Sequence, residues 1–234
     1  MDRIISEKEY IHDRLGEEFA RALSIYDTRR RVEVLIDEFL PESLAGKSVL
    51  DVGTGLGFFA ERLQQRGATV TAVDIGENLL KVVRERVGCQ CVCVDGLALT
   101  DHFGFNRFDL VVSSECIEHT PDPAAVLRQM VNVARPGALI SVSTPNILWS
   151  PVVKAATALR LRPFDGLEEF STFASIRSAL EKSGAVVLRE KGLHLFPFQF
   201  RLHRLSRWCD EHLQGLRSLM INLCVLAKKR SSVP

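Results

Sequence analysis

The sequence lacks any long apolar run. No stretch reaches the roughly 18 consecutive apolar residues of a membrane-spanning helix. The first residues, MDRIISEKEYIHDR, are densely charged where a secretory signal would have an apolar core. We therefore expect a soluble, cytoplasmic protein.

The sequence also has no excess charge of either sign. Its 30 Lys and Arg residues stand against 29 Asp and Glu residues, a formal net charge of +1 over 234 residues. Because nucleic-acid-binding chains usually carry a basic patch, no nucleic-acid partner is expected. With 46% hydrophobic residues the chain can bury one full core, and we predict a single domain over residues 1–234.

Cysteine is present, but in no pattern typical of a disulfide framework or a metal site. Cys89, Cys91 and Cys93 alternate along an expected strand, which spaces their thiols too widely for one ion, and the other three of the six cysteines are isolated. We interpret them as small apolar side chains in a reducing compartment.

What the sequence does contain is an alternation of strand and helix patterns from residue 47 onward. Short valine-rich runs predict strands, and they read SVLDVG, TVTAVD, CVCVD, FDLVVSSE and ALISVST. The helical stretches between them end at Gly67, Gly88 and Pro136-Gly137. Strands joined in this way form a parallel sheet with right-handed crossovers. The predicted fold class is α/β, a doubly wound, Rossmann-like and mostly parallel sheet.

Three further segments flank this core, which we place at residues 46–145. Residues 1–45 show helical apolar spacing and are expected to form a cap over the open edge of the ligand site. Residues 146–170 are predicted to be an irregular insert that serves as a substrate lid. Residues 171–234 are predicted to supply a helix over 172–183 and an antiparallel strand pair, AVVLREKGLHLF and SLMINLCVLAKK, that completes the sheet.

Acidic residues recur at the ends of the expected strands. Asp51, Asp74, Asp95 and Glu115 are 23, 21 and 20 residues apart, about one strand plus one helix each. Ligands of open α/β sheets bind at the carboxyl ends of the strands, so this spacing predicts an acidic ligand-binding rim. The alternative is that each acid caps the following helix.

The first of these acids leads into a glycine loop, VLDVGTGLGFFA, in which Gly53, Gly55 and Gly57 leave room for a ligand against bare backbone. A nicotinamide dehydrogenase is one candidate. However, the spacing is GxGxG instead of GxGxxG, and both tyrosines precede the loop, so no Tyr-x-x-x-Lys pair can follow it. A Walker A phosphate loop is excluded because no Gly-Lys-Ser/Thr follows.

Five segments resemble, in order and spacing, the motifs of class I S-adenosylmethionine-dependent methyltransferases: VLDVGTGLG, GATVTAVDIG, the acid Asp95, FDLVVSSECIEHTPDP and RPGALISVSTPN. The resemblance covers about residues 47 to 146. It implies that the glycine loop approaches the amino-acid end of S-adenosylmethionine, that Asp74 holds the ribose hydroxyls, and that Asp95 with Gly96 contacts the adenine. A cationic sulfonium also favours an acidic rim.

Within that superfamily the chain most resembles the ubiquinone-biosynthesis O-methyltransferases. The shared patterns are GATVT-x-x-D-x-G, E-x-x-E-H-x-P-D-P and GLH-x-x-P, and Arg31 matches an arginine that this family places on the cofactor. Phe164-Asp165-Gly166 stands where related enzymes tend to carry a histidine, so the substrate can differ. The cofactor-binding residues implied by these resemblances are Arg31, Asp51, Gly53, Thr54, Gly55, Gly57, Asp74, Ile75, Asp95, Gly96 and Ser114.

Glu115, Glu118 and His119 form a candidate catalytic cluster beyond the fourth strand. Two carboxylates this close must bind a proton, pair with an imidazolium or share a divalent cation. The stretch resembles the Mg²⁺-binding sequence of eukaryotic relatives of the ubiquinone enzymes and of small-RNA 2′-O-methyltransferases. Our hypothesis is that His119, or a Mg²⁺ ion held by all three residues, activates an acceptor hydroxyl. The alternative is that Glu115 only touches the cofactor and the other two cap the next helix.

His194 is a second candidate base, and its alternative is an ordinary core histidine. The run Leu195 to Arg207, LFPFQFRLHRLSR, mixes aromatic and basic residues and predicts either a peripheral membrane contact or a covered strand with a basic rim.

We predict an S-adenosylmethionine-dependent enzyme that methylates a hydroxyl of a small aromatic, quinone-like or hydrophobic metabolite. The alternatives are a metal-dependent RNA 2′-O-methyltransferase, N- or S-methylation of a small natural-product-like substrate, and a cofactor-binding module without activity. The sequence leaves the oligomeric state open.

Overall fold

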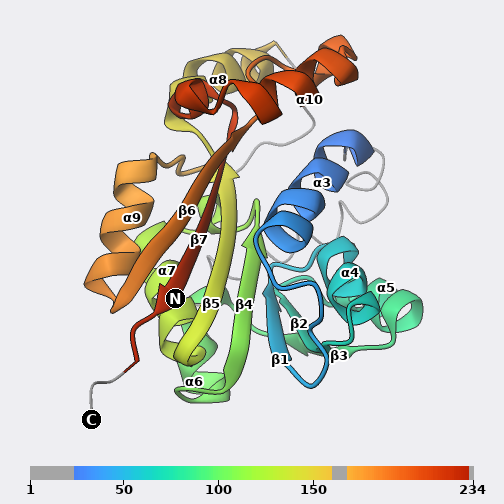
Figure 1. Cartoon of the computed structure of the whole chain (residues 1–234). Coiled ribbons are helices and arrows are strands. Elements are labelled where there is room, and N and C mark those ends of the chain that lie inside the picture. Colours follow the sequence, from blue (N-terminus) through green and yellow to red (C-terminus); the bar gives the residue numbers. More distant parts are fainter. Residues whose placement is uncertain (1–23, 160–167, 232–234) are drawn as a thin grey trace.

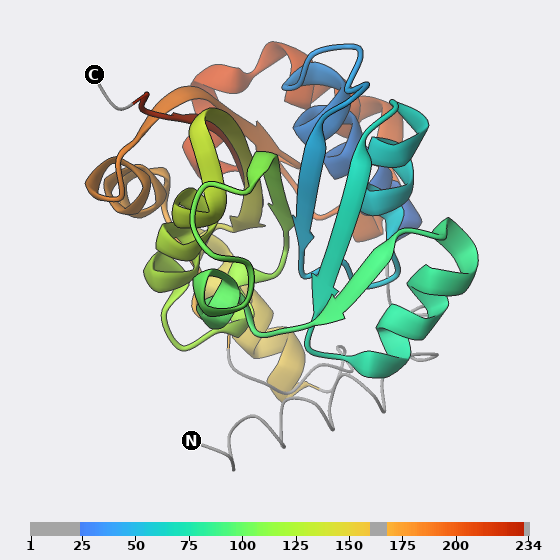
Figure 2. The ribbon, with the colours of Figure 1, turned by 90° about the horizontal axis from the view of Figure 1, so that it is seen from below.

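The computed structural model describes residues 24–159 and 168–231, which form a central sheet with helices on both faces (Figures 1 and 2). The part of the predicted cap within residues 1–23 lies outside the described residues, as does Phe164-Asp165-Gly166.

The sheet has seven strands in the order β3-β2-β1-β4-β5-β7-β6. The first five strands pair in parallel, and β7 runs antiparallel between β5 and β6. Both the doubly wound parallel sheet and the C-terminal antiparallel pair are therefore confirmed. The strands are β1 Ser48–Val52, β2 Thr69–Asp74, β3 Gln90–Cys93, β4 Phe108–Ser114, β5 Ala134–Pro145, β6 Ala185–Leu193 and β7 Asn222–Lys229.

Helices cover each face because the central strands are apolar on both sides. One face packs against α4 Phe58–Gln65, α5 Glu77–Val87 and the N-terminal pair α3 Ile25–Val32 and η1 Glu33–Glu38, the last a π-helix. The other face packs against α6 Leu99–Phe103, α7 Pro123–Val133 and α9 Phe173–Lys182. Side chains that alternate along β1 divide between the two cores, with Val49 on the first and Leu50 on the second.

The helix ends follow their sequence signals. Asp122 caps α7, with Pro123 in its first turn, and Gly88 ends α5 in the left-handed conformation. Thr172 and Ser175 form a capping box at the start of α9, as the predicted helix over 172–183 requires.

The carboxyl ends of β1 to β6 meet at one edge of the sheet, because β6 is parallel to β5. The segments that follow β5 and β6, which include α8 Ser150–Ala158 and α10 His203–His212, lie at this end of the molecule (Figure 1). The insert predicted to be irregular is thus helical over η4 Ile147–Trp149 and α8, a correction that Pro151 in the first turn of α8 explains. Within the described residues no helix has both the length and the apolar character needed to cross a membrane.

Candidate active site

The glycine loop joins β1 to α4 in a backbone conformation that only glycine adopts readily. Gly53, Gly55 and Gly57 have φ angles of 71°, 52° and 76°. At Gly53 a Cβ atom would also lie 2.3 Å from the Sγ atom of Cys116, on the segment after β4. The loop is therefore packed directly against the segment that follows β4, and its contact with the cofactor stays a prediction.

Asp74 ties this loop to the end of β2. Its Oδ2 atom accepts a hydrogen bond of 2.9 Å from the backbone N–H of Gly55, and its Oδ1 atom accepts one of 3.0 Å from the N–H of Gly76. Because Gly55 lies in the loop after β1 and Gly76 in the loop after β2, one carboxylate holds the two loops together. Ile75 lies between Asp74 and Gly76 in the second loop.

Asp51 lies beneath the loop and is almost fully buried. Thr54 donates its hydroxyl to Asp51 Oδ2 at 2.7 Å. Burial raises the pKa of Asp51 to about 7, aided by the charge of Asp74 and opposed by the Thr54 hydrogen bond. Two acids thus share a site that holds no basic partner for Asp51 among the described residues, an arrangement suited to a cationic ligand.

The next strand end carries Asp95, whose side chain caps the short helix η2 Gly96–Ala98 by accepting from the Leu97 N–H at 2.9 Å. Gly96 lies close to α7, since a Cβ atom there would lie 3.2 Å from Val126. The capping alternative is therefore present for Asp95, and its contact with the adenine stays a prediction.

Arg31 brings the N-terminal helix to the same edge. Its Nη1 atom donates to Ser114 Oγ, at the end of β4, at 2.5 Å. Asp27, one turn earlier on α3, accepts from Arg31 Nε at 3.1 Å. Arg31 and Ser114, both predicted to bind the cofactor, are therefore in direct contact.

The acidic cluster follows Ser114. Glu115 has a φ of 51° and accepts from Ser143 Oγ at 3.1 Å, and Glu118 accepts from Thr144 Oγ1 at 3.1 Å. Burial and the charge of Glu118 raise the pKa of Glu115 to about 7, while Arg31 opposes the shift. Burial likewise raises the pKa of Glu118 to about 7. The two carboxyl groups are thus poised to hold or release a proton near neutral pH.

The predicted magnesium site is not supported. No group of three or more His, Cys, Asp or Glu residues in the described part of the chain could hold a metal ion. His119, on η3 Ile117–His119, lies 3.9 Å from Glu118 Oε1, beyond hydrogen-bonding distance. A cation from the protein itself, Arg31, lies near the two carboxylates instead. Burial lowers the pKa of Arg31, but the negative charges of Asp27, Glu115 and Glu118 raise it further.

His194 lies just after β6 and is fully buried. Its Nε2 atom is 3.0 Å from Asp27 Oδ1 and its Nδ1 atom is 3.1 Å from Ser206 Oγ on α10. Both ring nitrogens are occupied, so this environment matches the core-histidine alternative. Its role as a base stays a prediction.

The sequence analysis missed Asp27, Thr144, Ser206 and Asp210, which orient the residues above. Only Asp27 had a local signal, its position four residues before Arg31 on a helix, which favours an ion pair.

Comparisons with known proteins identify the family and the fold of the chain. A family model described as a methyltransferase domain matches residues 25–192. The ubiquinone biosynthesis O-methyltransferase of Stutzerimonas stutzeri is 36% identical over 146 residues, which cover 59% of this chain and 62% of that protein. The protein of the same name from Bordetella bronchiseptica is 37% identical over 161 residues, 61% of this chain and 65% of the relative. The chain thus matches somewhat under two thirds of the length of these relatives.

Among solved structures, an S-adenosylmethionine-dependent methyltransferase from Mesorhizobium loti superposes with a TM-score of 0.65 at 21% identity, covering 85% of this chain and 98% of that structure. At this identity the similarity concerns the fold alone.

Proposed function

This chain belongs to the class I S-adenosylmethionine-dependent methyltransferases, and from that premise we propose that it transfers a methyl group to a hydroxyl of a small aromatic, quinone-like or hydrophobic metabolite. The observation that carries the proposal is the convergence of the glycine loop, Asp74 and the Glu115–Glu118 pair at one edge of the sheet. The two O-methyltransferase relatives support the hydroxyl acceptor.

The residues present fit the cofactor. Asp74, together with Asp51 when it is ionised, provides negative charge beside bare loop backbone, which complements a ligand with cationic sulfonium and ammonium groups. S-adenosylmethionine supplies an electrophilic methyl group. The chain would hold it through the loop N–H groups, the Asp74 carboxylate and the Arg31 guanidinium, and it would exclude water from the reacting atoms.

The acceptor hydroxyl needs a group that takes its proton, since a phenol has a pKa of about 10. Glu115 and Glu118, with pKa values near 7, and His119, partly exposed beside them, are the groups that would accept it. Arg31 would stabilise the oxyanion formed as the proton leaves, because it already faces both carboxylates.

The test has a binding arm and a transfer arm. Calorimetric titration with S-adenosylhomocysteine is expected to show one site, which Asp74→Asn weakens at least tenfold. Labelled S-adenosylmethionine is then offered with a catechol, a primary amine, a thiol and a short RNA. Label on the catechol alone supports the proposal. Label on the RNA, amine or thiol replaces it by the corresponding alternative, and binding without transfer to any acceptor supports a module without activity.

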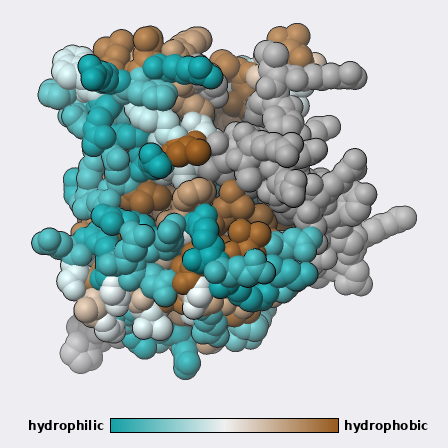
Figure 3. Space-filling view, turned by 90° about the vertical axis from the view of Figure 1, so that its right-hand side faces the viewer, coloured by the Kyte–Doolittle hydropathy of each residue, from teal (hydrophilic) through white to brown (hydrophobic). Residues whose placement is uncertain are grey.

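We also propose a peripheral contact with an anionic membrane through η5 Phe198–Phe200 and α10. Leu202, Leu205 and Trp208 are each about half exposed next to Arg201 and Arg204, which form no ion pair with any described residue. Hydrophobic residues also gather along the top of the molecule in Figure 3, the end at which α8 and α10 lie. A cytoplasmic location accords with such a contact.

Co-sedimentation with anionic vesicles at low salt tests this contact. Leu205→Ser is expected to reduce binding severalfold, while Leu188→Ser, an equally exposed leucine on β6, leaves it unchanged. No binding by the wild-type chain would refute the membrane contact.

A further inference from the structure

Arg31 uses most of its hydrogen-bonding capacity on the protein. Its Nε and Nη2 groups face Asp27 and Thr28, and its Nη1 atom donates to Ser114. Its hydrogen bonds use three of the five guanidinium N–H groups, one each on Nε, Nη1 and Nη2, and Nη2 also lies 3.0 Å from Asp27 Oδ2 in an ion pair. Among the described residues only Ser114 accepts a hydrogen bond from Nη1, so the second N–H of Nη1 is the group that an incoming ligand can use.

The orientation of that group depends on Asp27. Asp27 Oδ2 receives the Nε atom of Arg31 at 3.1 Å and its Nη2 atom at 3.0 Å, so the guanidinium is held on two nitrogens. Burial opposes the ionised form of Asp27, but the charge of Arg31 and the contact with His194 hold its pKa at about 2. Asp27 is therefore a fixed anion on α3.

Asp27 is in turn fixed by His194. Its second oxygen, Oδ1, lies 3.0 Å from His194 Nε2, so one carboxylate is held on both sides. His194 itself is anchored to α10, because its Nδ1 atom contacts Ser206 and its backbone N–H donates to Asp210 Oδ1 at 2.8 Å. The φ of 61° at His194 is a left-handed conformation that Asp210 stabilises through this bond.

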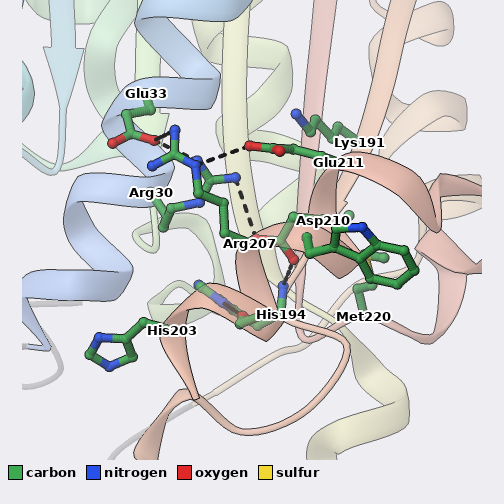
Figure 4. A network of polar contacts seen from close by, with 12 residues as sticks. Arg30, Glu33, Lys191, His194, His203, Arg207, Asp210, Glu211 and Met220 are labelled. Carbon is green, nitrogen blue, oxygen red and sulfur yellow. Dashed lines mark hydrogen bonds and ion pairs between the residues drawn. The ribbon is translucent and has the colours of Figure 1, made fainter. Parts of the chain in front are cut away.

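Asp210 also connects α10 to α3 directly. In Figure 4 it lies between Arg30 and His194, and its Oδ2 atom is 3.5 Å from Arg30 Nη2. Since Arg30, Asp210 and His194 are all essentially buried, separating α10 from α3 would expose or leave unpaired several charged groups at once. This contact joins distant parts of the chain, since Asp27 and His194 are 167 residues apart in sequence.

We propose that His194 is a positioning residue for cofactor binding: through Asp27 it fixes the guanidinium of Arg31, and it makes the packing of α10 on α3 a condition for tight binding. This inference rests on the proposed function, because it takes Arg31 as a cofactor ligand. It assigns His194 no proton transfer, since both ring nitrogens are engaged within the protein.

The test compares His194→Ala, His194→Gln and the control His212→Gln, which changes an exposed histidine at the end of α10. The Kd for S-adenosylhomocysteine, kcat at saturating S-adenosylmethionine and Tm without ligand are measured for each. His194→Ala is expected to raise Kd at least tenfold and to change kcat less than about threefold. His194→Gln, which keeps an N–H donor for Asp27, is expected to recover most of the affinity, and His212→Gln to match the wild type.

Three results would overturn the inference. A hundredfold loss of kcat with unchanged Kd would make His194 a base. A lower Tm with unchanged Kd would make it a structural residue only. An unaltered Arg31 Nε–H signal in the NMR spectrum of His194→Ala, assigned with Arg31→Lys, would show that Arg31 is not held through His194.

Should His194→Ala fail to fold, Ser206→Ala removes only the Nδ1 partner and is expected to raise Kd about threefold; an unchanged Kd would contradict the inference. Failure of the proposed function is distinguishable, because it appears in the acceptor assay of the wild-type chain, whereas the effect of His194→Ala on the Kd for S-adenosylhomocysteine is measured without any acceptor.

Discussion

Arg31 on α3 donates a hydrogen bond of 2.5 Å from its Nη1 atom to Ser114 Oγ at the end of β4. Residues 83 positions apart in the chain therefore meet at the carboxyl edge of the sheet, beside the Glu115–Glu118 pair. This contact makes α3 part of the candidate site and gives the acidic cluster a fixed counter-charge.

Replacing Arg31 by lysine is expected to weaken binding of S-adenosylhomocysteine about tenfold or more. Lysine keeps the charge but cannot face Asp27 and Ser114 with a planar fork of donors. Calorimetry measures the change, and Arg29→Lys, an exposed arginine on the same helix, is the matched control. Equal affinities for the two variants would remove Arg31 from the cofactor site.

Much of the fold was predictable because its signals are local. Valine-rich strand patterns, strand-end acids and helix-terminating glycines each depend on neighbouring residues, and they predicted the sheet and the loop from Gly53 to Gly57. Arg31 was found only through a family resemblance, because nothing near it in sequence indicates that it meets Ser114.

The rest could not be predicted because it depends on contacts between distant segments. Asp27 resembles any acid on an amphipathic helix until His194 and Arg31 bury it. The Glu115–Glu118 pair suggested a metal, since the sequence does not show that a cation from α3 lies next to it.

Gly53→Ala is expected to destabilise the protein more than Gly46→Ala does. Both glycines have left-handed φ angles, 71° and 73°, but a Cβ atom at Gly53 would lie 2.3 Å from Cys116 Sγ, while none of the surrounding atoms lies within 4 Å at Gly46. The conformational strain of about 1–2 kcal/mol applies to both, and overpacking adds about 1–3 kcal/mol only at Gly53. Urea denaturation measures both, and equal losses would contradict the packing argument.

The stability of the ligand-free protein is expected to fall with rising pH in a way that depends on Asp51. Its pKa is raised from 3.8 to about 7 by burial, so the folded state binds a proton that the unfolded state has released. The stabilisation of the folded state by this proton is complete below about pH 4 and is lost as the pH rises through 7.

Between pH 5 and 8 the unfolding free energy of Asp51→Asn should therefore fall by roughly 2–3 kcal/mol less than that of the wild type. The exposed Asp101→Asn on α6 is the control and should keep the wild-type slope. If the unfolding free energy of Asp51→Asn falls with pH as steeply as that of the wild type, Asp51 is already ionised in the folded protein at pH 5.

Chelation of divalent metals is expected to leave methyl transfer unchanged. Arg31 already balances the charge of Glu115 and Glu118, and His119 is 3.9 Å from the nearer Glu118 oxygen. Turnover is measured after dialysis against EDTA, with and without added Mg²⁺. A loss that Mg²⁺ restores would reinstate the metal hypothesis.

His119→Ala and Glu118→Gln together separate the possible bases. Glu118 is buried and bonded to Thr144, whereas about a quarter of the His119 side chain is exposed, so His119 is the group that an acceptor hydroxyl can reach directly. We expect His119→Ala to lower kcat by about a hundredfold, within the range for loss of a general base, with Kd for S-adenosylhomocysteine unchanged. Glu118→Gln keeps the hydrogen bond from Thr144 but loses the charge, and a smaller decrease of about tenfold is expected. If both variants retain wild-type kcat at saturating cofactor, the cluster has no part in proton removal and serves only to hold the segment after β4.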